Sequence, residues 1–66
     1  MQVSLAAARV NAKLTQAEVS EKIGVTQGTL VRWETGDKYP PVPVFKALCN
    51  LYGCKMDDIF VPSTLV

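Results

Sequence analysis

The chain has 66 residues, of which 48% are hydrophobic and 20% charged, and its net charge is +1. This apolar fraction excludes a disordered chain, and the length allows only one small domain. The sequence has no histidine, which removes the commonest general base and metal ligand, and its two cysteines are too few for a disulfide scaffold or a four-thiolate zinc site. No apolar stretch approaches the about 20 residues of a membrane span. We therefore expect a cytoplasmic protein without metal or cofactor, and not an enzyme.

The first predicted helix starts near Ser4 and ends within residues 11–13. Leu5, Ala8 and Ala12 recur there at helical spacing and form an apolar stripe. Arg9 lies on the same stripe, where a charged group must either reach solvent or have a buried partner.

Two short helices follow, joined by a glycine turn. Thr15 and Glu18 form a capping box that opens the first of them, and Gly24 ends it. Thr26 opens the second, whose inward side carries Leu30 and whose outward side is polar without acidic residues. This pattern is typical of a helix-turn-helix, although plain helical bundles also contain it. Trp33 joins Leu30 on the inward side, and Gly36 ends the helix. The outward residues are Gln27, Gly28, Val31 and Arg32.

A fourth helix begins near Pro43, after a turn-rich loop over residues 37–41, and ends at Gly53. Its apolar stripe consists of Phe45, Leu48, Cys49 and Tyr52. A last short turn covers residues 56–60, and no stretch alternates with period two, so the sequence predicts an all-α chain without a sheet. We expect a single domain over residues 1–66, with a core over about 4–60 and a tail over 61–66.

Specific motifs then suggest a family. Leu14-Thr15-Gln16, the Gly24-Val25 break and Trp33-Glu34-x-Gly36 resemble the helix-turn-helix domains of lambdoid phage repressors and Cro proteins, the XRE family. The resemblance runs from about Leu5 to Phe60. It implies a compact five-helix bundle and sequence-specific binding to double-stranded DNA. It also implies a homodimer on a partly palindromic operator and transcriptional regulation, in this case repression.

The resemblance also implies residue roles. Val31 is added as a candidate base contact because it lies on the outward side of the helix. Gly28 departs from the polar residue usual at its position, so it either lets the backbone approach the bases or leaves a gap. Val31 either covers a thymine methyl group or packs locally, and Tyr39 either contacts a phosphate or covers the core. The expected base contacts are Gln27, Gly28, Val31 and Arg32; the expected phosphate contacts are Gln16, Thr26, Lys38 and Tyr39; the expected structural ion pair is Arg9 with Glu34.

Two further features leave alternatives open. Cys49 and Cys54 are predicted to pack in the core as small hydrophobes. The apolar end of the chain predicts a dimer interface, with a disordered tail or a chain cut short as alternatives. The expected interface residues are Leu51, Ile59, Phe60 and Val61.

A second function class also stays open, namely a protein-interaction module on the same scaffold that binds a repressor or a toxin. Residues 1–56 carry seven basic and four acidic residues, a net charge of only +3, which favours this class slightly. Gln16, Gln27 and Arg32 favour DNA binding more strongly.

Overall fold

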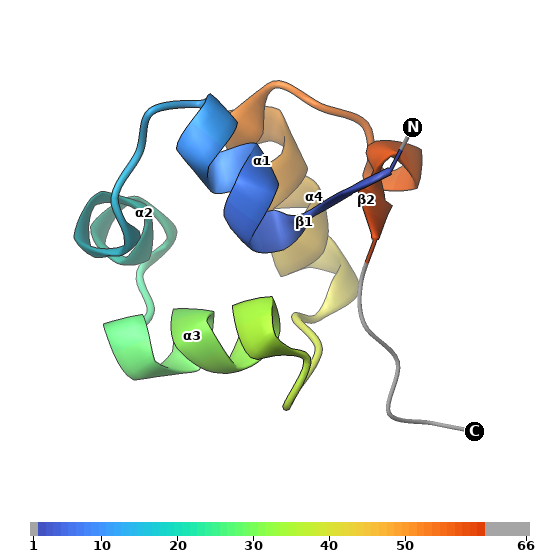
Figure 1. Ribbon diagram of the computed structural model, residues 1–66. Coiled ribbons are helices and arrows are strands. Elements are labelled where there is room, and N and C mark those ends of the chain that lie inside the picture. Colours follow the sequence, from blue (N-terminus) through green and yellow to red (C-terminus); the bar gives the residue numbers. More distant parts are fainter. Residues whose placement is uncertain (1, 61–66) are drawn as a thin grey trace.

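The computed structural model describes residues 2–60, and for Phe60 it describes the backbone but not the side chain. Four helices pack around a common core, and the N-terminal strand lies beside the C-terminal one (Figure 1). In chain order the elements are β1 (Val3–Ser4), α1 (Leu5–Asn11), α2 (Gln16–Ile23), α3 (Gln27–Thr35), α4 (Val42–Tyr52), the 3-10 helix η1 (Met56–Asp58) and β2 (Ile59–Phe60).

Side-chain caps define where the first three helices begin. Ser4 Oγ accepts a hydrogen bond from the Ala7 amide at 3.0 Å, which starts α1. The predicted capping box is present at α2, where Thr15 Oγ1 accepts from the Glu18 amide at 3.1 Å and Glu18 Oε1 accepts from the Thr15 amide at 2.9 Å. These bonds satisfy amides that have no partner within the helix. The helix starts predicted from the sequence are therefore confirmed at Ser4 and Thr15.

The prediction of five helices is wrong, because residues 2–60 contain four α-helices. In place of the fifth, η1 spans three residues, closed by the Asp58 amide donating to the Lys55 carbonyl at 2.9 Å. The next residue, Ile59, has extended backbone angles of φ −104° and ψ 127°. Ile59 pairs with Val3 in this extended conformation, which a β-branched residue favours, so the turn does not continue as a helix.

The expectation of no sheet is also wrong. Val3 pairs with Ile59 and Ser4 with Phe60 in a two-residue parallel ladder. Gln2 reinforces the link, because its Nε2 donates to the Asp57 carbonyl at 3.3 Å. The ladder ties the beginning of the described chain to its end and places Ile59 against α1.

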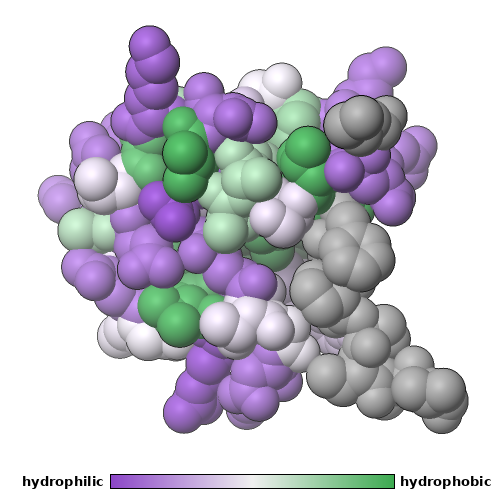
Figure 2. Space-filling model, viewed as in Figure 1, coloured by the Kyte–Doolittle hydropathy of each residue, from purple (hydrophilic) through white to green (hydrophobic). Residues whose placement is uncertain are grey.

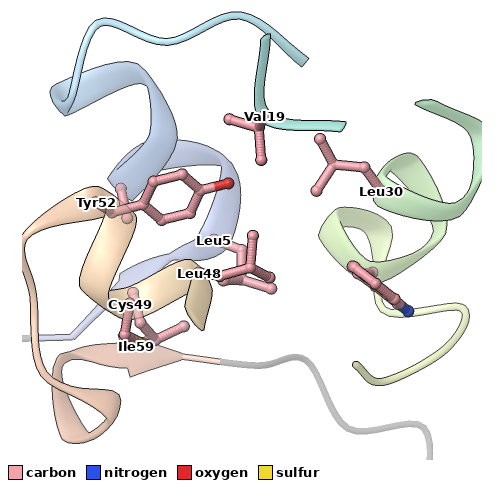
Figure 3. Close-up of a cluster of buried hydrophobic side chains, with 9 residues drawn as sticks. Leu5, Val19, Leu30, Leu48, Cys49, Tyr52 and Ile59 are labelled. Carbon is pink, nitrogen blue, oxygen red and sulfur yellow. The ribbon is translucent and has the colours of Figure 1, made fainter. Parts of the chain in front are cut away.

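The core lies between the four helices and β2 (Figure 3). Every helix contributes to it, and Val19, Leu30 and Leu48 are completely inaccessible to solvent. Burying a side chain of this size contributes about 1.5–3 kcal/mol. This shared core holds α2 and α3 in a fixed relation. The core residues are Leu5, Ala8, Val19, Leu30, Trp33, Leu48, Cys49, Tyr52 and Ile59.

Candidate nucleic-acid interface

The helix-turn-helix consists of α2, a turn over residues 24–26 and α3. Gly24 has φ 88°, the left-handed conformation that glycine adopts most readily. The Val25 amide donates to the Ser20 carbonyl at 3.0 Å, which closes the end of α2. Thr26 Oγ1 then accepts from the Thr29 amide at 3.2 Å, which opens α3. The tight turn therefore fixes the angle at which α3 leaves α2.

The two sides of α3 differ sharply in burial. Leu30 is 0% exposed and Trp33 is 6% exposed, and both lie in the core. The opposite side faces solvent, and Figure 2 shows hydrophilic side chains along the lower edge, where α3 lies in Figure 1. The predicted base-contacting residues are all exposed on this helix: Gln27, Gly28, Val31 and Arg32.

Gly28 has open space around it. A Cβ atom built at this position would meet only Thr26 Oγ1, at 3.9 Å, which is an ordinary van der Waals distance. The fold itself therefore does not require glycine here. A helical glycine costs about 0.5–1 kcal/mol relative to alanine.

Val31 and Arg32 lie on the second turn of α3, on its exposed side. Arg32 Nε lies 4.0 Å from Asp37 Oδ2, and both side chains are more than 60% exposed. An exposed pair of this kind contributes little to stability and leaves the guanidinium available to other partners. Val31 is 37% exposed, so an apolar group lies beside the Arg32 charge.

Arg9 and Glu34 form the ion pair that the resemblance implied. Arg9 Nε donates to Glu34 Oε2 at 2.8 Å, with side-chain exposures of 14% and 6%. The guanidinium also donates through Nη1 to the Leu14 carbonyl at 2.9 Å. The pair therefore joins α1, the loop before α2 and the end of α3.

Gln16 extends this cluster through a hydrogen bond to Glu34 that the sequence did not predict. Its Nε2 donates to Glu34 Oε1 at 3.0 Å, so Glu34 accepts one hydrogen bond at each oxygen. A primary amide has a second N–H and a carbonyl oxygen, and both remain for other partners. The structure therefore anchors the predicted phosphate-contacting side chain to the end of α3. No local signal links residues that are 18 positions apart.

The other predicted phosphate contacts lie at the two ends of α3. Thr26 caps the start of the helix, and its Oγ1 also lies 2.9 Å from Thr29 Oγ1. Lys38 and Tyr39 follow the helix and are both exposed. The Lys38 amide donates to the Arg32 carbonyl at 3.3 Å, which holds the loop against the helix end. The candidates thus flank the exposed side of α3.

Tyr52 has an unexpected polar environment. Sequence periodicity placed it in the core, where it is 9% exposed, but its hydroxyl makes no hydrogen bond to a described protein atom. The pKa of Tyr52 is raised from 10.0 to about 12, mainly by burial and then by the negative charge of Glu34, while the positive charge of Arg9 opposes the rise. The charges of the Arg9–Glu34 pair therefore act on the pKa of Tyr52 in the core.

The predicted interface residues differ in their surroundings. Ile59 is 4% exposed and packs in the core of its own chain, so its side chain is not available to a second copy in this arrangement. Leu51 is partly buried against the same core. Phe60 is described only in its backbone, and Val61 lies outside the described residues.

Two other features are absent from residues 2–60. No group of three or more histidine, cysteine or carboxylate side chains there could hold a metal ion. No helix in this part of the chain has the length and apolar character needed to cross a membrane.

Comparisons with known proteins agree with this geometry. A family model described as helix-turn-helix matches residues 5–59. A protein of Methanocaldococcus jannaschii, named an uncharacterized HTH-type transcriptional regulator, is 31% identical over 48 residues, which are 73% of each chain. A Bacillus subtilis protein with the same kind of name is 33% identical over 46 residues, which are 70% of each chain. No solved structure matched the chain.

Proposed function

The chain belongs to the XRE-type helix-turn-helix family, and from this premise we propose that it is a sequence-specific DNA-binding transcriptional repressor. Its α3 lies in the major groove of a partly palindromic operator, and two copies of the chain bind the two half-sites. The proposed protein acts by binding and has no catalytic role.

The observation that carries this proposal is the exposed side of α3. Gln27 and Arg32 are exposed on a helix whose other side is anchored in the core. Glutamine can bond the adenine edge through two atoms, and arginine can bond guanine O6 and N7 together. A rigidly held helix with both residues outward can therefore discriminate base pairs. Val31 adds an apolar surface for a thymine methyl group.

Phosphate contacts set the orientation of the helix in the groove. Thr26 precedes α3 and Lys38 follows it. Gln16 is held near the C-terminal end of α3 by its hydrogen bond to Glu34. Contacts of this kind hold a protein in register without reading the sequence. In the proposed dimer, the two α3 helices lie about 34 Å apart, one turn of B-DNA.

Selection from a pool of random duplexes tests the proposal directly. We expect enrichment of an inverted repeat with half-sites about 10 base pairs apart, centre to centre. The control is the double variant Gln27→Ala, Arg32→Ala, which replaces only exposed side chains and should enrich no common sequence. A parent chain that enriches no sequence would contradict the proposal.

A protein-interaction module remains the second candidate, because Gly28 offers no side chain to a base and Asp37 places a negative charge next to Arg32. The two candidates differ in their response to bulk duplex DNA. A DNA-binding protein retains weak binding that falls steeply as salt rises. A module that binds another protein shows no such binding.

A further inference from the structure

Two thiols lie at the C-terminal end of α4, at the opposite side of the molecule from α3 (Figure 1). Cys49 is 2% exposed and belongs to the core, whereas Cys54 is partly exposed just beyond the helix. Both are free thiols. The proposed DNA contacts use neither of them.

The helix end brings the two residues together. The Cys54 amide donates to the Cys49 carbonyl at 3.0 Å, and the Gly53 amide donates to the Asn50 carbonyl at 3.3 Å. Gly53 has φ 73°. This combination is the Schellman motif, in which the side chains of the first and last residues usually touch. In α4 these two side chains are Cys49 and Cys54.

The end of α3 has the same motif, and its side chains at the two corresponding positions also lie near each other. There the Asp37 amide donates to the Arg32 carbonyl at 2.9 Å, and the corresponding side chains reach 4.0 Å. In α4, the same two positions are occupied by Cys49 and Cys54. The closed turn at the end of α4 therefore places the Cys49 and Cys54 side chains next to each other.

We propose that Cys49 and Cys54 form a dithiol redox site that closes to an intramolecular disulfide, with a low-molecular-weight disulfide such as oxidised glutathione as the oxidant. The more exposed Cys54 loses its proton, and its sulfur attacks one glutathione sulfur and releases the first glutathione. Cys49 then gives its proton to water, attacks the Cys54 sulfur and releases the second. The protein loses two electrons and two protons, and oxidised glutathione becomes two molecules of its thiol form.

The burial of Cys49 sets the rate of the second step. Burial first, and then the neighbouring Cys54 thiol, raise the pKa of Cys49 to about 11. Only the thiolate attacks a disulfide, so the glutathione adduct at Cys54 should persist at neutral pH and convert to the disulfide about tenfold faster per pH unit. In a reducing compartment the resting form is the dithiol, and the disulfide is transient.

Mass spectrometry of the full folded chain tests the proposal. The chain is treated with oxidised glutathione, quenched with acid and digested with trypsin, which cleaves after Lys46 and Lys55 and leaves both cysteines in fragment 47–55. After reaction at alkaline pH we expect this fragment to have lost the mass of two hydrogen atoms, whereas at neutral pH it should carry the glutathione adduct for longer. Cys49→Ala should instead stop at a glutathione adduct on Cys54, and Cys54→Ser should remain unmodified while folded.

The remaining outcomes overturn the proposal. These are a stable glutathione adduct in the parent chain at every pH, disulfides only between two copies, or no reaction. A synthetic peptide of residues 47–55 serves as the control without a fold. The equilibrium constant for disulfide formation should be at least about tenfold larger in the folded chain than in the peptide. Equal constants would contradict a site built by the fold. No readout uses DNA, so the result is independent of the proposed function.

Discussion

At the scale of single residues, Glu34 has the most consequential position. Its two carboxylate oxygens accept from Arg9 and Gln16, and its side chain is only 6% exposed. Breaking a buried pair by removing one member costs far more than the pair itself contributes, because the other charge stays buried without a partner. Arg32 and Asp37 provide the opposite case, since water already solvates both charges.

We therefore expect Glu34→Ala to reduce the free energy of unfolding by about 3–5 kcal/mol. In a domain of this size the melting temperature should fall by more than about 10 °C. Asp37→Ala is the matched control and should change stability by no more than about 0.5 kcal/mol. Thermal unfolding followed by circular dichroism measures both variants. Equal melting temperatures for the two would rule out a stabilising role of the buried pair.

Tyr52 connects stability to alkaline pH. Its pKa is raised from 10.0 to about 12 in the folded chain, mainly by burial, so the phenol keeps its proton longer when folded. The stability that it contributes is complete below pH 10 and is lost as the pH rises from 10 to 12. The loss amounts to about 2–3 kcal/mol.

Tyr52→Phe should retain the stability of the parent chain at pH 7, or increase it slightly, because the hydroxyl makes no hydrogen bond to a described protein atom. The variant should also lose less stability than the parent between pH 10 and 12. Cys49, with its pKa raised to about 11, contributes to the alkaline loss in both proteins and therefore cancels in the difference. Urea unfolding across this pH range measures that difference. Parallel pH profiles for the two proteins would contradict the raised pKa.

At the scale of elements, predictions from the sequence succeeded where the signal is local. The caps at Ser4, Thr15 and Thr26 depend on residues three positions apart, and these helix starts were predictable. The ladder between Val3 and Ile59 joins two residues from opposite ends of the chain. Two-residue strands are too short for an alternating pattern, so only tertiary packing reveals them. The hydrogen bond from Gln16 to Glu34 also joins residues far apart in the sequence, so no local pattern predicts it.

Within α3, Gly28→Ala separates a structural role from a DNA-binding role. The added Cβ would meet nothing closer than 3.9 Å, so the variant should be about 0.5–1 kcal/mol more stable than the parent. If the backbone approaches the bases at this position, the same methyl group should weaken operator binding. Stability and affinity would then change in opposite directions. A more stable variant with unchanged affinity would show that Gly28 leaves a gap in the interface.

The exposed surface of α3 and the loop after it should divide into base reading and phosphate holding. Arg32→Ala should reduce operator affinity by about 1–3 kcal/mol and relax the preference at one base pair in each half-site. Lys38→Ala should weaken binding to all duplexes alike and lower the salt dependence by about one ion per subunit. Titrations of specific and scrambled duplexes at several salt concentrations compare the two variants. Equal losses of Arg32→Ala on both duplexes would reassign base reading to Gln27 and Val31.

At the scale of the whole molecule, the described chain uses Ile59 to complete its own core. Both ends of the described part meet in the ladder of β1 and β2, so Ile59 and the Phe60 backbone are anchored beside Val3 and Ser4, which directly precede α1. The sequence alone could not divide the apolar residues near the end between a core and an interface, because both uses require the same residue types. The structure assigns Ile59 to the core, which leaves Phe60 and Leu51 as the candidates within residues 2–60 for contact with a second copy.

Phe60→Asp tests the proposed dimer against a matched change elsewhere. A negative charge placed in an apolar interface must lose its hydration without gaining a partner, so self-association should weaken. Val10→Asp introduces the same charge on α1 at an apolar residue that is already 59% exposed, and it should leave self-association unchanged. Analytical ultracentrifugation measures the association of both variants.

Operator titrations should show that Phe60→Asp loses affinity for the full inverted repeat but binds a single half-site like the parent chain. Linked half-sites add their binding energies only when the two copies are joined. A Phe60→Asp variant that sediments as a tight dimer would place the interface on another surface of the molecule.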